Sequence, residues 1–157
     1  MNSIKKILVM GLPRSGKTTL CRELSKQLNA VWFDADEIRA NINKDLGFSL
    51  NDRIEQSRRM WWLCDKVVEA GHYAISSFVC PTEETRQAFG IEETFIVYLD
   101  TISTDLSPYQ DTNLIFSKPK FYDVIFTKWN DPSKMAEETV KELNYVLLNR
   151  DRNSFII

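Results

Sequence analysis

One segment, residues 11–18, constrains what this chain can fold into more than any other. It reads Gly-Leu-Pro-Arg-Ser-Gly-Lys-Thr, which matches G-x-x-x-x-G-K followed by Ser or Thr in full, and it follows the apolar run Ile4–Met10. Such a loop, between a buried strand and a helix, points successive backbone N–H groups at phosphate oxygens. It therefore predicts a nucleoside triphosphate site, in which Lys17 reaches the β- and γ-phosphates and Thr18 binds Mg²⁺. The residues expected to contact the nucleotide are Gly11, Leu12, Pro13, Arg14, Ser15, Gly16, Lys17, Thr18 and Thr19.

Length and composition limit the classes of protein to which this chain can belong. Its 157 residues suit one domain, 1–157, with a single core. It is 43% hydrophobic and 27% charged, as ordinary globular proteins are, and its net charge of −2 argues against a nucleic-acid or membrane partner. The three cysteines stand at unrelated spacings, so we expect reduced thiols in a cytoplasmic protein.

Hydrophobic periodicity predicts alternating strands and helices along the whole chain. The expected strands are 4–10, 30–33, 73–79, 94–99 and 122–127, and the expected helices are 16–29, 37–44, 49–70, 82–89 and 132–149. Residues 101–121, rich in Pro, Ser, Thr, Asn and Asp, are expected to be irregular. This order predicts an α/β three-layer sandwich with a five-stranded parallel sheet and a P-loop kinase fold.

Ligands of open parallel sheets bind at the carboxyl ends of the strands, which directs attention to the turn after the second strand. There Asp36 and Arg39 stand three residues apart at the start of a helix and share a face. The carboxylate suits a proton acceptor that also helps to hold Mg²⁺, and the arginine suits an anion clamp. The alternative is that Asp34 or Asp36 only caps the helix.

A second polar cluster lies in the long helix that begins near residue 49. It consists of Arg53, Gln56, Arg58 and Arg59. Arg53 and Gln56 share a face of that helix, and this spacing is compatible with a functional cluster. A solvent-exposed face balanced by Asp52 and Glu55 explains the same pattern equally well.

Several strings together resemble the adenylylsulfate kinase family. They are Asp-Ala-Asp-Glu-Ile-Arg at 34–39, Asn-Lys-Asp-Leu-Gly-Phe-Ser at 43–49, Asp52-Arg53, Arg58-Arg59, Ser-Phe-Val-Cys-Pro at 77–81 and Arg86. Enzymes of this family phosphorylate the ribose 3′-hydroxyl of adenosine 5′-phosphosulfate with MgATP and produce 3′-phosphoadenosine 5′-phosphosulfate. The resemblance is dense over residues 7–60 and fades after Asp100.

This resemblance implies a role for each matching residue. Asp36 and Lys17 are the expected catalytic residues, and Thr18 and Asp36 the expected metal ligands. Arg39 and Arg53 would contact the phosphosulfate end of the acceptor, while Phe48 would stack on its adenine. The full set of residues expected to bind the acceptor is Arg39, Phe48, Arg53, Gln56, Val79, Cys80 and Phe116.

The chain also departs from the family pattern. Gln56 stands where the family usually has Asn, Cys80 where it often has Ser, and Arg14 where a small residue is common. The basic lid that normally follows the fourth strand is missing, and residues 107–116 take its place, with only Lys118 and Lys120 for charge. In that segment Phe116 is either a second wall for the acceptor base or a core residue.

These departures leave more than one function open. The first alternative keeps the P-loop kinase chemistry and changes the acceptor to another nucleotide or small-molecule hydroxyl. The second is a nucleotide-binding regulatory protein without turnover, although Lys17, Thr18 and Asp36 argue against it. Trp61 and Trp62 cannot share a helix face, so an exposed tryptophan would suggest a homodimer surface.

Overall fold

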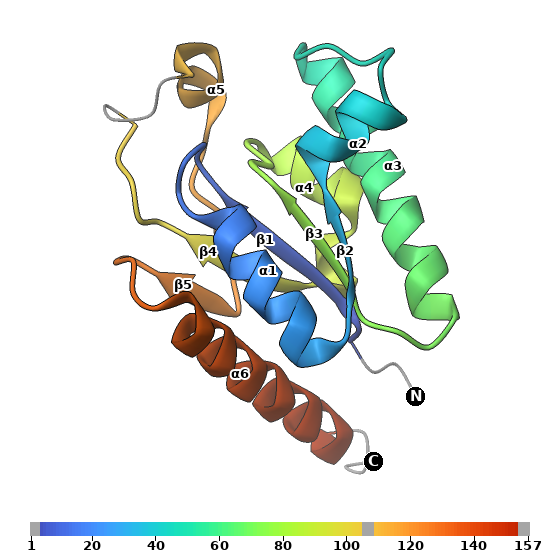
Figure 1. The fold of residues 1–157 in the computed structure, drawn as a ribbon. Coiled ribbons are helices and arrows are strands. Elements are labelled where there is room, and N and C mark those ends of the chain that lie inside the picture. Colours follow the sequence, from blue (N-terminus) through green and yellow to red (C-terminus); the bar gives the residue numbers. More distant parts are fainter. Residues whose placement is uncertain (1–3, 105–108, 154–157) are drawn as a thin grey trace.

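The computed structural model describes residues 4–104 and 109–153 of the chain (Figure 1). Its strands are β1 (Lys6–Gly11), β2 (Val31–Asp34), β3 (Ala74–Phe78), β4 (Phe95–Leu99) and β5 (Val124–Phe126). Its helices are α1 (Lys17–Leu28), α2 (Ala35–Asn41), α3 (Leu50–Glu69), α4 (Glu83–Phe89), α5 (Gln110–Ile115) and α6 (Pro132–Asn153), with a 3₁₀ turn at Ile91–Glu93. No helix among the described residues is long and apolar enough to cross a membrane.

The five strands form one parallel sheet, as the sequence predicts, and the structure shows their order to be β2-β3-β1-β4-β5. Strand β1 lies at the centre, paired with β3 on one side and β4 on the other. Helices α1 and α6 cover one face of the sheet, and α2, α3 and α4 lie on the other (Figure 1). Because all strands run the same way, their carboxyl ends meet at one edge, and the loops there are brought together.

Alternate residues of β1 serve two separate cores, which explains its unbroken apolar sequence. Ile7 and Val9 pack with α1 and α6, whereas Leu8 and Met10 pack with α2, α3 and α4. All four side chains are fully buried. The loop that follows β1 therefore continues from a strand that is buried on both faces.

Two regions differ from the sequence prediction. Helix α2 begins at Ala35 rather than 37 because the Asp34 side chain caps it. The segment 101–121, predicted to be irregular, contains α5, which has no side-chain cap at its first turn. Contacts with distant residues hold α5 instead, and local patterns do not reveal such contacts. Ser107 and Pro108 of the predicted lid replacement lie outside the described residues.

Candidate functional site

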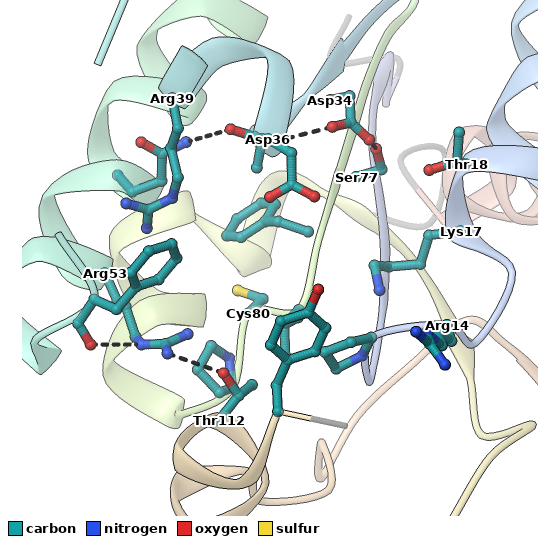
Figure 2. A pocket seen from close by; sticks show the side chains of 18 of the residues that line it. Arg14, Lys17, Thr18, Asp34, Asp36, Arg39, Arg53, Ser77, Cys80 and Thr112 are labelled. Carbon is teal, nitrogen blue, oxygen red and sulfur yellow. Dashed lines mark hydrogen bonds between the residues drawn. The ribbon is translucent and has the colours of Figure 1, made fainter. Parts of the chain in front are cut away.

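A cleft of about 1010 Å³ opens at the carboxyl ends of the strands (Figure 2). Five parts of the chain line it: the phosphate-binding loop with the start of α1, the β2–α2 turn, the start of α3, the β3–α4 turn and the start of α5. The first part is expected to face the triphosphate, and we call the remaining four the acceptor side.

The loop between β1 and α1 has glycines where no other residue fits. A Cβ on Gly11 would lie 2.6 Å from the Leu99 carbonyl oxygen, and one on Gly16, whose φ is 104°, would lie 2.2 Å from the Trp129 ring. Both distances are shorter than real carbon contacts. The two glycines of the motif are therefore required by packing against β4 and by the loop that follows β5.

Lys17 is held at the centre of this loop. Its Nζ donates hydrogen bonds of 2.9 Å to the carbonyl oxygens of Gly11 and Leu12. Burial lowers the pKa of Lys17 to about 8, and the negative charges of Asp36 and Asp34 partly oppose that fall. A buried ammonium that is balanced only in part attracts an anionic ligand.

Arg14 adopts a left-handed backbone conformation, with φ of 65°, within the same loop. A non-glycine residue pays a steric cost there, and such strain collects at functional sites. Its side chain is exposed and the residue lines the cleft. The structure thus places an extra cation beside the phosphate-binding loop.

The turn after β2 separates a capping carboxylate from a free one. Asp34 Oδ1 accepts hydrogen bonds from the backbone N–H groups of Asp36 (2.9 Å) and Glu37 (3.3 Å). Asp34 is thus the cap, and Asp36 keeps an exposed carboxylate that lines the cleft. In the view of Figure 2, Asp36 lies between Arg39 and Lys17. The capping alternative raised by the sequence therefore holds for Asp34, and the role expected of Asp36 stays a prediction.

Two guanidinium groups flank one aromatic ring on the acceptor side. The Cζ of Arg39 lies 4.6 Å from the centroid of the Phe48 ring, and that of Arg53 lies 5.4 Å from it. Arg39 donates to the Gly47 carbonyl (2.7 Å), and Arg53 Nε donates to the Phe48 carbonyl (2.9 Å). Burial lowers the pKa of both arginines, and the charge of Arg53 lowers that of Arg39 further. This arrangement suits an anion next to a planar group.

The remaining polar residues of α3 have structural partners. Gln56 is buried, donates to the Ala35 carbonyl (3.3 Å) and accepts from Asn43 (2.8 Å), so it joins α3 to α2 while lining the cleft. Arg58 binds Glu55, and Arg59 binds both Glu55 and Asp45. Neither arginine lines the cleft. For these two residues the structure has the ion-paired face that the sequence left as the alternative, with Glu55 as expected but Asp45 in place of Asp52 as the second counter-charge. Asp52 instead accepts a hydrogen bond of 3.1 Å from the Gly47 amide.

Val79 and Cys80 line the cleft at the β3–α4 turn, as the resemblance implies. The backbone of Cys80 is left-handed, with φ of 48°. Its thiol is buried, which raises the pKa of the thiol to about 12. Like the other cysteines, Cys21 and Cys64, it is free. The side chain is therefore neutral at physiological pH, and the turn offers backbone groups.

Phe116 does not line the cleft, so of its two alternatives the structure favours the core residue over the second wall. The Phe116 ring stacks on Tyr98, with centroids 6.4 Å apart, and the Arg86 guanidinium lies 6.0 Å from its centroid. Phe116 directly follows the C-terminus of α5, whereas the N-terminus of that helix lines the cleft. There the lining residues are Tyr109, Gln110, Asp111 and Thr112.

Sequence reasoning missed these four residues because no periodic or capping signal marks α5. Tyr109 is 58% exposed, whereas Thr112 is buried and its hydroxyl accepts a hydrogen bond of 3.0 Å from Arg53 Nη2. The lysines after α5 do not replace a basic lid. Lys118 binds Asp100 at 3.0 Å, and neither Lys118 nor Lys120 lines the cleft.

The chain resembles known proteins over most of the described sequence. Residues 4–121 match the family model described as adenylylsulphate kinase. An adenylyl-sulfate kinase from Oceanobacillus iheyensis is 31% identical over 122 residues, which are 73% of this chain and 61% of that protein. Adenylyl-sulfate kinase 3 from Arabidopsis thaliana is 37% identical over 87 residues, 52% of this chain and 42% of the relative. The chain spans less than two thirds of the length of these relatives.

Solved structures share the fold. The APS kinase CysC of Mycobacterium tuberculosis, solved in complex with AMPPNP and APS, matches with a TM-score of 0.74 at 23% identity, over 89% of this chain and 98% of that one. Shikimate kinase from Aquifex aeolicus matches with a TM-score of 0.64 at 20% identity, over 91% and 98% of the two chains. These similarities confirm the predicted P-loop kinase fold.

Proposed function

This chain belongs to the adenylylsulfate kinase family, and from that premise we propose that it transfers the γ-phosphoryl group of ATP to the 3′-hydroxyl of adenosine 5′-phosphosulfate. One observation supports the proposal most strongly. A single cleft joins the phosphate-binding loop to an acceptor side on which Asp36 is free and Arg39 and Arg53 flank Phe48.

The proposed reaction is an in-line transfer, in which positioning and charge neutralisation supply most of the catalysis. The acceptor oxygen forms a bond to the γ-phosphorus, the bond from that phosphorus to the β,γ-bridging oxygen breaks, and ADP leaves. Asp36 accepts the proton of the attacking hydroxyl. Lys17 exchanges its bonds to the loop carbonyls for bonds to the phosphates, while Arg39 and Arg53 hold the phosphosulfate.

Mg²⁺ is expected to accompany ATP, and the residues present fit it. Among the described residues no group of three or more His, Cys, Asp or Glu side chains forms a metal cage. Mg²⁺ does not need one, because it binds through one or two protein oxygens together with phosphates and water. The exposed Thr18 hydroxyl and the uncapped Asp36 carboxylate supply such oxygens. When bound, Mg²⁺ would neutralise charge on the transferring phosphoryl group.

The decisive experiment is an ADP-release assay with a panel of acceptors. We expect turnover with adenosine 5′-phosphosulfate, a loss of at least about 100-fold in Asp36→Asn, and near wild-type rates in Glu37→Gln. Glu37 is a matched control because it is an exposed carboxylate in the same helical turn that does not line the cleft. ATP binding without turnover on any acceptor would contradict the proposal and favour a regulatory protein.

A second candidate function, the same transfer to another small-molecule hydroxyl, rests on one observation. Of the described residues 109–121, none that lines the cleft is basic, and Asp111 there is acidic. Such an acceptor side is less cationic than a basic lid would make it. The same panel, extended to sugars and other nucleotides, distinguishes the two candidates by the acceptor with the highest kcat/KM.

We further propose a cytoplasmic homodimer that acts in sulfate assimilation. Three free, buried thiols support the location. Trp62, which is 50% exposed on α3, supports a subunit contact. A sedimentation measurement on the wild-type protein and on Trp62→Glu tests the dimer, which the variant should dissociate.

A further inference from the structure

Helix α5 brings a carboxylate to the acceptor side that no sequence motif marks. We propose that Asp111 is a specificity-determining residue: it weakens the binding of acceptor-side ligands in proportion to their negative charge. The inference rests on the proposed function, because it takes the acceptor to be an anion held by Arg39 and Arg53.

The position of Asp111 follows from the contacts of its neighbour. Thr112 is buried and accepts a 3.0 Å hydrogen bond from Arg53 Nη2, so the first turn of α5 is fixed against this guanidinium (Figure 2). Asp111 lines the same cleft and is exposed. Its charge also opposes the fall in the pKa of Arg53 that burial causes. The carboxylate thus acts on the arginine expected to bind the acceptor anion.

The charges of the acceptor side decide the consequence. On the acceptor side the cleft is lined by two cations, Arg39 and Arg53, and by three carboxylates, the capping Asp34 and the uncapped Asp36 and Asp111. Lys118, a cation in the segment that follows α5, binds Asp100 and does not line the cleft. The carboxylates on this side therefore outnumber the cations, so each negative charge on a ligand adds repulsion from Asp111.

The charges on the acceptor side also affect how fast the product is released. Transfer of a phosphoryl group makes the product more negative than the acceptor. A carboxylate beside the anion-binding arginine penalises the product more than the acceptor, so it favours release of the product after transfer. A basic residue in the same place would retain the product instead.

The test measures dissociation constants by titration calorimetry for three probes of rising charge: adenosine, adenosine 5′-phosphosulfate and 3′-phosphoadenosine 5′-phosphosulfate. The proteins are the wild type, Asp111→Asn, and Glu92→Gln as a matched control. Glu92 is an exposed carboxylate in the 3₁₀ turn before β4, at the end of that strand opposite the cleft. All titrations are done at low and high salt, since screening weakens any charge effect.

We expect Asp111→Asn to leave adenosine binding unchanged, to tighten phosphosulfate binding about threefold, and to tighten product binding about tenfold at low salt. Glu92→Gln should match the wild type. The inference would be overturned if the ratio of the wild-type to the variant dissociation constant were the same for all three probes. Weaker binding of the two anions by the variant would also overturn it.

The two proposals fail in different ways. If the wild type binds the charged probes in the cleft but does not turn over the phosphosulfate, the proposed function fails, and the binding ratios still decide the role of Asp111. If neither protein binds a charged probe, both proposals are overturned. If the wild type turns over the phosphosulfate but Asp111→Asn changes the dissociation constants of all three probes equally, only the role of Asp111 is overturned.

Discussion

The Asp34 carboxylate accepts a hydrogen bond of 3.0 Å from the Ser77 hydroxyl, so the residue that caps α2 is also fixed to the neighbouring strand β3. Ser77 in turn accepts from Trp32 Nε1 at 2.9 Å. Because Asp34 holds the amides of Asp36 and Glu37, this network sets the orientation of the helical turn that carries Asp36. Asp34 is thus a positioning residue for the expected proton acceptor.

Replacing Asp34 tests that role. Asp34→Ala removes the cap, so the free energy of unfolding should fall by about 1–2 kcal/mol in a denaturant titration. The kcat should also fall at least about tenfold, because Asp36 is no longer held in place, while the KM for ATP changes little. Asp34→Asn keeps an oxygen for the cap and should recover most of the stability. A wild-type kcat in Asp34→Ala would contradict the positioning role.

Lys17 should make both stability and ATP binding depend on pH. Its pKa in the folded chain is about 8, below the ordinary value of 10.5, so the folded state holds fewer protons than the unfolded state between these pH values. The contribution of Lys17 to the free energy of unfolding should therefore rise as pH increases through this window.

Phosphates favour the charged ammonium, so ATP binding near pH 8.5 should be accompanied by proton uptake. Calorimetry in buffers of different ionisation enthalpy measures that uptake directly. Lys17→Arg, which stays charged, is the control and should show none. Equal uptake in the variant would assign the protons to another group.

Arg14 should contribute to activity at the expense of stability. Arg14→Gly relieves the left-handed strain, so the free energy of unfolding should stay level or rise by up to about 1 kcal/mol, since glycine also adds chain entropy. If Arg14 supplies part of the charge that a basic lid would bring, kcat should fall about tenfold or more. Melting curves and steady-state kinetics on one preparation test both effects, and an unchanged rate would rule out the charge role.

Phe48 and Phe116 should respond to truncation in opposite ways. Phe48 is 66% exposed, so Phe48→Ala should cost less than about 1 kcal/mol of stability but raise the KM for the acceptor. Phe116 packs on Tyr98, so Phe116→Ala should cost about 2 kcal/mol and change the KM for the acceptor little. Thermal denaturation and acceptor kinetics of the two variants provide the comparison. Similar kinetic defects in both would place Phe116 in the site after all.

The sequence by itself determined the features that depend on neighbouring residues. The phosphate-binding loop needs Gly11, Gly16, Lys17 and Thr18 at a fixed spacing, and the central strands β1 and β4 show their burial as unbroken apolar runs. For this reason the parallel sheet, every helix except α5 and the position of the phosphate-binding loop could be predicted. The placement of Asp36 and Arg39 on one face of α2 was also visible, since they stand three residues apart in the sequence.

Only the tertiary structure decided what distant contacts control. In the structure Asp34 is the residue that caps α2, and its carboxylate is held by Ser77, which lies 43 positions away. The first turn of α5 is held by the hydrogen bond from Arg53 to Thr112, 59 positions away. The structure also shows that Phe116 is partly buried and packs on Tyr98. These side chains carry no periodic signal, because their partners come from other strands and helices. The acceptor side of the cleft is built mainly from such contacts, so its composition, Asp111 included, emerges only in three dimensions.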